Sequence, residues 1–190
     1  MTTVITLFLG ITAFFSLLVF ILKGLGLFKL AKLEILEKPI LAFIPVANNY
    51  ILGSLAENKE KPSNLKKLLL ILNIIAIITM AVFLASSGFA ISSVFESAKL
   101  AIETDVELTL SELKPFILVL VTFVLAVAAV AVYKVFYYIS LWRVYNKQDK
   151  NKALMAIILS VVFAFLVPVF LLVLKKQESY SESELLQEAE

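Results

Sequence analysis

The sequence predicts an all-α integral membrane protein built as a four-helix bundle. Three observations support this fold class: 61% of the 190 residues are hydrophobic, the mean hydropathy is +0.98, and four long apolar windows follow one another along the chain. Soluble proteins are about 45–50% apolar, and a helix needs about 20 residues to cross the hydrocarbon core of a bilayer. The predicted spans, within a membrane domain of residues 1–176, are 2–22, 68–87, 116–140 and 153–174.

The composition also restricts the chemistry. The chain has no cysteine and no histidine, and its net charge is +2. Disulfides, thiol nucleophiles, imidazole acid–base chemistry and the usual zinc sites are therefore excluded. With no glycine-rich phosphate loop either, we expect no cofactor, no metal site, no nucleic-acid partner and no enzyme activity.

The first apolar window is predicted to be a retained span. A signal peptide begins with a basic region and ends in a small-residue cleavage site. Here the lysines begin only after the window, at Lys23, and no cleavage site is seen.

Lysine and arginine orient the spans, because both are in excess on the cytoplasmic side. Eight lysines and four glutamates lie between spans one and two, and one arginine, three lysines and one aspartate lie between spans three and four. The connector at 88–114 and the tail at 177–190 are acidic. Four spans then place both termini outside, although Lys175 and Lys176 fit the cytoplasmic side better.

The uncharged segment from Ile40 to Ala56, within a cytoplasmic loop at 38–62, is expected not to cross the membrane. It is 17 residues long, and crossing would put a proline and two adjacent asparagines in lipid. We expect a helix–turn segment that lies in the interface or dips shallowly, after Pro39 ends a helix continuing from span one. Its candidate partner-binding residues are Pro45, Asn48, Asn49 and Tyr50.

Outside, residues 92–103 predict a short amphipathic helix. Ser93 and Glu96 have the spacing of a capping box, and apolar residues recur on one face. The tail at 177–190 is acidic and is expected to be solvated.

Within the predicted spans, Lys134 is the only formally charged residue and Asn73 is the most polar uncharged residue. Intramembrane polar residues are candidates for function. Lys134 is also close enough to the inner end of its span to snorkel, and Asn73 at similar depth can serve packing, so both interpretations stay open.

Aromatic residues gather at the inner end of span three. Such residues concentrate at headgroup level without any ligand, which predicts an interfacial belt. Its members are Tyr133, Tyr137, Tyr138, Trp142 and Tyr145. In span four, Pro168 predicts a kink near the outer end.

The stretch LAFIPVANNYILGSLAE resembles a pattern in small, largely uncharacterised bacterial membrane proteins that sometimes accompany signal peptidases. Ile44, Pro45, Asn48 and Tyr50 match its Ile-Pro-x-x-Asn-x-Tyr core. The resemblance implies a bacterial plasma-membrane protein with a motif on the cytoplasmic face and brings no activity with it.

These observations favour a non-catalytic accessory subunit or scaffold that binds the bilayer and another membrane protein or a second copy of itself. The alternative is a small oligomeric transporter or channel component with Asn73 and Lys134 along its path. A membrane enzyme ranks third, because no nucleophile and base occur at matching depth.

Overall fold

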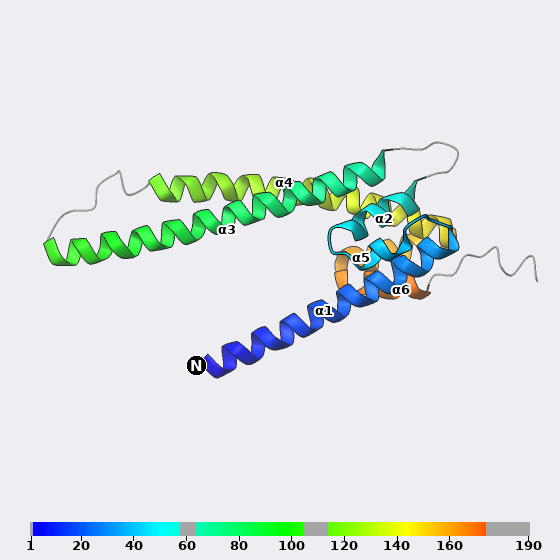
Figure 1. The fold of residues 1–190 in the computed structure, drawn as a ribbon, viewed down its shortest axis with the longest axis horizontal. Helices are drawn as coiled ribbons and strands as arrows, with labels where there is room; N and C mark the ends of the chain where they lie inside the picture. The colour runs from blue at the N-terminus through cyan, green and yellow to red at the C-terminus, as the bar shows by residue number, and fades with distance from the viewer. Residues whose placement is uncertain (1, 58–63, 105–113, 174–190) are drawn as a thin grey trace, which may run out of the picture. The chain divides into compact units, whose positions relative to one another are not determined.

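The protein is all-α throughout the part that the structure describes. A computed structural model describes residues 2–57, 64–104 and 114–173, and within these ranges it contains helices and no strand (Figure 1). The chain divides into two compact units. Unit 1 comprises Met1–Leu70 and Phe136–Glu190, and unit 2 comprises Ile71–Val135.

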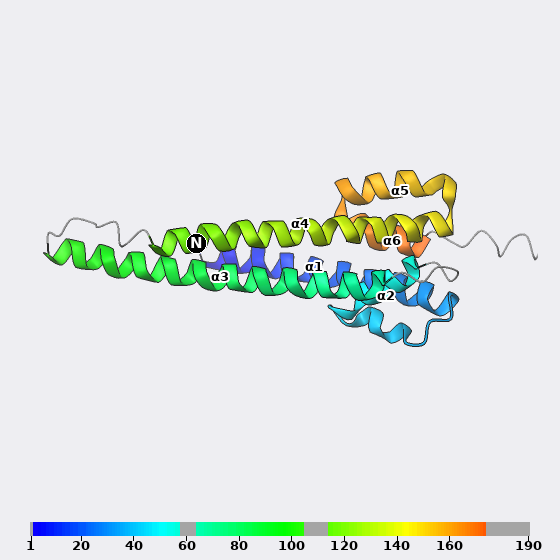
Figure 2. The same ribbon diagram turned by 90° about the horizontal axis from the view of Figure 1, so that it is seen from above.

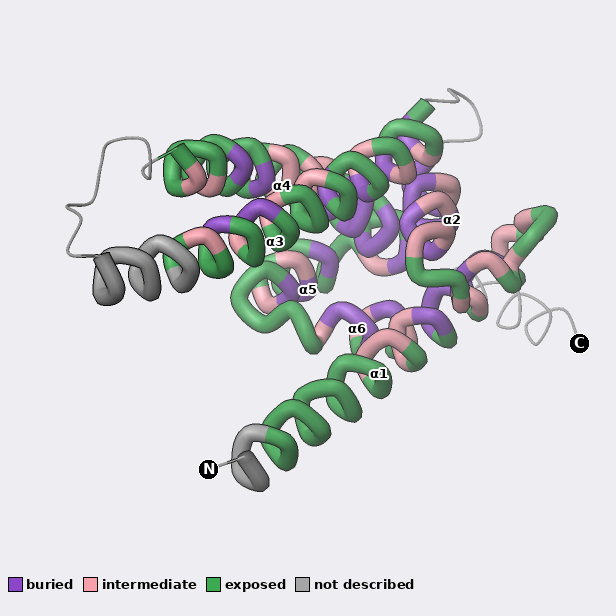
Figure 3. The backbone as a smooth tube through the Cα atoms, turned by 60° about the vertical axis from the view of Figure 1, so that its left-hand side comes forward, coloured by how far each residue is buried: buried purple, intermediate pink, exposed green. Residues whose placement is uncertain are grey.

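Three helices are long and apolar enough to cross a membrane. They are α1 (Thr2–Leu33), α3 (Leu65–Thr104) and α4 (Lys114–Gln148). Their apolar segments have mean hydropathies of 2.2, 2.9 and 2.9, and few of their residues are buried inside the protein. Figure 3 shows α1 exposed along residues 6–18. The prediction of an α-helical membrane protein is thus confirmed at the level of three apolar helices.

The predicted separate helix on the outer side does not exist as such. Helix α3 runs without a break from Leu65 to Thr104, so residues 92–103 continue the helix of the second apolar window. The Ser93 hydroxyl bonds back to the carbonyl of Ala90 at 2.8 Å and caps no helix start. A helix that leaves the bilayer can continue in water when its sequence favours helix, which explains why the periodicity alone misplaced a boundary here.

The fourth predicted span, 153–174, is not one helix. Helix α5 (Lys150–Val162) ends at Phe163, whose φ and ψ are −123° and 86°. A short 3₁₀ turn, η3 (Ala164–Leu166), and helix α6 (Val167–Val173) follow. The 13 residues of α5 extend about 20 Å, less than the about 30 Å of the hydrocarbon core.

Helix α6 runs in the opposite direction to α5, so that residues 150–173 form a hairpin, which we call the second hairpin. Figures 1 and 2 both show α5 leaving the end of α4 and α6 returning toward it. Pro168 is the second residue of α6 and is buried. It begins a helix, where its missing N–H costs little, and does not kink a span as predicted.

A first hairpin follows α1. It consists of the 3₁₀ helix η1 (Pro39–Phe43) and helix α2 (Ala47–Ala56). The ring of Phe43 lies 2.9 Å from the position of a Cβ on Gly24, nine residues before the end of α1. The hairpin therefore folds back along α1 by about 13 Å, before α2 returns (Figure 2).

The sequence predicted that the first helix continues to Pro39. Helix α1 instead ends six residues earlier, at Leu33. The amide of Leu36 donates to the carbonyl of Ala31 at 2.9 Å, and that of Ile35 donates to Lys32 at 3.2 Å. This pair of bonds is a Schellman motif. Ile35 occupies its left-handed position, with φ 54°.

The core of unit 1 lies where both hairpins meet the last third of α1 and the last third of α4. Close packing depends on two glycines. A Cβ on Gly26 would lie 2.7 Å from the Cβ of Leu171 in α6, and one on Gly53 would lie 2.6 Å from the Cα of Lys66 in α3. Fully buried side chains of this core are Leu27, Leu30, Ile51, Leu52, Leu55, Leu69, Leu141, Tyr145 and Leu171.

Unit 2 is a pair of helical segments held by small and polar residues. The buried positions of this unit on α3 and α4 form three pairs, each three or four residues apart: Asn73 with Ala76, Ser86 with Ala90, and Thr122 with Ala126. Small residues at such spacing let membrane helices approach closely. The hydroxyls of Ser86 and Thr122 bond across the pair at 2.8 Å, and the rings of Phe83 and Phe123 lie 5.4 Å apart.

Candidate functional site

The first hairpin contains the candidate motif. Pro45 is exposed at the tip, two residues before α2 begins, and Tyr50 is half-buried. Asn48 and Asn49 occupy the first turn of α2 and are each only 3% exposed. The four predicted residues therefore lie within six consecutive residues, but they differ in burial. The proline is exposed, the two asparagines are buried and the tyrosine is half-buried.

The side-chain oxygens of Asn48 and Asn49 are buried and accept no hydrogen bond from the described chain. Leaving such a group unpaired costs about 1–3 kcal/mol. The backbone of Asn48 is satisfied, because its amide donates to Ile44 at 2.9 Å. The unpaired acceptors thus belong to the side chains, near the hairpin tip.

Lys147 of α4 holds the other end of α2. Its Nζ donates to the carbonyl of Leu55 at 2.6 Å and also to the carbonyl of Glu57. A helix leaves its last carbonyls without partners, and a cation there also matches the helix dipole. Lys147 therefore ties the first hairpin to α4 across some ninety residues of sequence.

Replacing Lys147 by methionine should loosen this attachment. Two carbonyls at the end of α2 would lose a charged donor, and we expect unfolding to become easier by about 1–2 kcal/mol. Thermal unfolding in mild detergent measures the change. Lys150→Met, at an exposed lysine three residues away, is the matched control, and an equal loss in both variants would contradict the capping role.

Glu57 joins the end of α2 to the start of α3. One carboxylate oxygen accepts from the amide of Lys66 at 3.2 Å, and the other lies 3.2 Å from its Nζ. A carboxylate at a helix start satisfies free amides and matches the dipole. With Gly53 packed against Lys66, the exit of the first hairpin is fixed in direction.

The second hairpin is fixed through Tyr145 of α4. Its hydroxyl lies 3.1 Å from that of Ser160 in α5, and its ring lies 6.0 Å from that of Phe170 in α6. Asp149 caps α5 by accepting from the amides of Asn151 and Lys152 at 3.0 and 3.3 Å. One tyrosine therefore contacts both arms of the hairpin.

The predicted aromatic belt has two different roles. Tyr145 is fully buried, and Tyr137 is 7% exposed with the Nζ of Lys23 4.8 Å from the centre of its ring. Both belong to the core of unit 1. Tyr133 and Tyr138 are half-buried and Trp142 is 36% exposed, so these three retain surface for an interface.

The two intramembrane polar residues lie in unit 2 with different exposures. Asn73 is 8% exposed, whereas Lys134 is exposed. An exposed lysine near the inner end of a span fits snorkelling.

Several residues of the site escaped the sequence reasoning. Lys147, Glu57 and Ser160 form its polar contacts, and none lies in a motif. One signal was available: the tips of both hairpins share a short sequence, AFIPV at 42–46 and AFLVPV at 164–169. In each case a 3₁₀ turn precedes the proline, and a helix begins close to it, two residues after Pro45 and one residue before Pro168.

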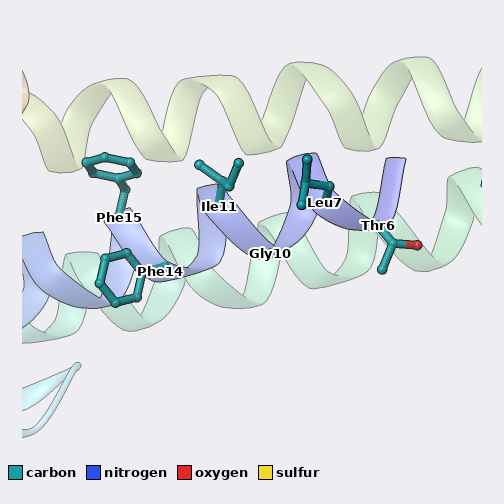
Figure 4. Close-up of a pocket in the computed structure, with 6 residues that line it drawn as sticks. All are labelled: Thr6, Leu7, Gly10, Ile11, Phe14 and Phe15. Carbon is teal, nitrogen blue, oxygen red and sulfur yellow. The ribbon is translucent and has the colours of Figure 1, made fainter. Parts of the chain in front are cut away.

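Two hollows of the described surface are apolar. One, of about 550 Å³, is lined by Thr6, Leu7, Gly10, Ile11, Phe14 and Phe15 of α1 (Figure 4). Another, of about 380 Å³, lies in unit 2 beside Ser87 and Phe116. Within the described residues no group of three or more carboxylate, imidazole or thiol side chains could hold a metal ion. Neither hollow therefore combines the convergent polar groups that a catalytic site needs.

No family model matches this sequence, and no curated protein and no solved structure shows significant similarity to it.

Proposed function

We propose that the chain is a non-catalytic protein of the bacterial plasma membrane that serves as an accessory subunit or scaffold for another membrane protein. The observation that carries this proposal is how unit 1 uses its polar groups. Lys147, Glu57 and Tyr145 are occupied in fixing the two hairpins. The apolar helix faces, by contrast, are free to meet lipid or a partner.

The tip of the first hairpin is the proposed contact for that partner. Ile44 is 49% exposed and Pro45 is exposed beside it, on a support fixed at both ends of α2. A rigid, preorganised turn loses little entropy on binding. Asn48 and Asn49 support the tip from inside and do not face the partner directly.

A transporter component is the second candidate. Irregular backbone at membrane depth is tolerated where protein buries it or where it lines a watery cavity, and two hairpins dipping into the bilayer would fit this rule. The unpaired oxygens of Asn48 and Asn49 are the specific observation in its favour.

Co-purification from native membranes in mild detergent tests the main proposal. We expect a membrane protein in stoichiometric amount with the wild-type chain. Pro45→Ala should reduce the partner by several-fold at unchanged yield of folded chain, because helix α2 can then extend and reorient the tip. Leu52→Ala, at a fully buried position, is the contrasting variant and should reduce the yield itself by destabilising the core by about 2–5 kcal/mol.

Absence of any partner, or equal loss of folded protein in both variants, would contradict the scaffold proposal. Solute or ion flux in proteoliposomes that falls in Asn48→Leu would then favour the transporter.

A further inference from the structure

The turn after α1 holds an isoleucine in a conformation that isoleucine avoids. Ile35 has φ 54°, the only positive φ among the described residues other than glycine. A β-branched side chain in this region is strained, and glycine is the usual residue at this position of a Schellman motif. The backbone bonds of the motif hold the turn in place despite the strain.

The side chain of Ile35 also lies away from the protein. It is 88% exposed, the largest fraction among the exposed large hydrophobic residues, and Leu33 and Ile40 beside it are 59% and 64% exposed. Packing therefore does not explain why a strained isoleucine stands here. A strained residue that a structure maintains points to a functional constraint on that residue.

Basic side chains surround the turn. Lys29, Lys32 and Lys38 are exposed on either side of it, whereas Glu34 and Glu37 lie within it, so residues 29–38 have an excess of one positive charge. The described residues of unit 1 carry ten basic and four acidic side chains, an excess of six positive charges. Apolar side chains flanked by lysines are typical of segments that insert into the boundary between headgroups and acyl chains of an anionic leaflet.

We propose that residues 33–40 anchor unit 1 in the anionic cytoplasmic leaflet. Leu33, Ile35 and Ile40 enter the boundary region, and the lysines contact lipid phosphates. The anchor fixes the depth at which the first hairpin folds back along α1. This proposal depends on the membrane helices and not on the scaffold role. An experiment can therefore contradict the anchor without contradicting the scaffold role, and the reverse.

Depth-dependent quenching tests the anchor, and the chain suits it because it has no native cysteine. Ile35→Cys and Glu37→Cys, each carrying an environment-sensitive fluorophore, are compared in purified protein reconstituted into vesicles with acyl-chain spin-labelled lipid. Glu37 is exposed in the same turn and serves as the matched control. We expect several-fold stronger quenching at position 35 than at position 37, and a larger blue shift in phosphatidylglycerol than in phosphatidylcholine vesicles.

Ile35→Gly provides the second measurement. Because glycine adopts positive φ freely, the melting temperature in detergent should rise or stay unchanged. A fluorophore at Leu33→Cys is then compared in two proteins, one with Ile35 and one with Ile35→Gly. In phosphatidylglycerol vesicles, its quenching should be weaker in the protein with Ile35→Gly. Equal quenching at positions 35 and 37 would overturn the proposal. Water-like emission from the fluorophore at position 35 in lipid vesicles would also overturn it, and is expected if a protein partner, not lipid, covers this residue.

Discussion

Replacing Gly26 by leucine should remove the packing of the second hairpin on α1. A Cβ at this position would lie 2.7 Å from the Cβ of Leu171 and 3.3 Å from its backbone carbonyl carbon. These atoms are fixed to the backbone of α6 and cannot rotate away. Helix α6 must therefore shift as a whole, and overpacking of this kind costs about 1–3 kcal/mol or more. Thermal unfolding in mild detergent should show a lower melting temperature, and limited proteolysis should reach α6.

The chain supplies a matched control on the same helix. Gly10 has no atom within 4 Å of its Cβ position. Gly10→Leu adds the same volume where nothing must move, and we expect no loss of stability. If both variants unfold at the temperature of the wild-type protein, the contact between α1 and α6 is not part of the folded unit.

Hydropathy predicted the three helices that are long and apolar enough to cross a membrane, because it measures the transfer of residues into lipid directly. The same measure could not distinguish a span from a hairpin at 153–174. Phe163, where the helix breaks, is neither proline nor glycine, and the window is apolar throughout. Tertiary contacts lie on both sides of the break, namely those of Tyr145 with Ser160 and of Gly26 with Leu171. No local pattern reports such contacts.

The candidate site was predictable in part for the same reason. Asn48 and Asn49 attracted attention because adjacent amides in an apolar run are expensive. The structure places them inside the hairpin, where their side-chain oxygens stay unpaired. Lys147 looked like one of many cytoplasmic lysines, because its carbonyl partners at Leu55 and Glu57 are distant in sequence. From the sequence, Ile35 was predicted to continue the first helix. Its positive φ could not be predicted, because a β-branched residue rarely adopts that conformation.

The second hairpin changes the expected position of the C-terminus. Helices α5 and α6 run in opposite directions, so the chain returns toward the end of α4 (Figure 2). With three spans and an outer N-terminus, we predict that the C-terminus lies in the cytoplasm. Lys175 and Lys176 then join the other lysines inside, and the one disagreement with the positive-inside rule disappears. The acidic tail does not oppose this, because acidic residues contribute little to orientation.

Single cysteines at positions 58, 99, 150 and 184 test this topology in intact cells, since the wild-type chain has none. A membrane-impermeant maleimide should label position 99 alone, and positions 58, 150 and 184 should react only after permeabilisation. The result at 184 is all or none and distinguishes the two topologies, because a fourth span over 153–174 would expose it outside. Labelling at position 58 in intact cells would show that the predicted orientation of all the spans is reversed. Labelling at 184 with 58 and 150 protected would instead mean that the second hairpin opens into a continuous span in the bilayer. The contacts of Tyr145 with Ser160 and Phe170 would then be absent in the membrane, and Tyr145→Ala would leave the melting temperature unchanged.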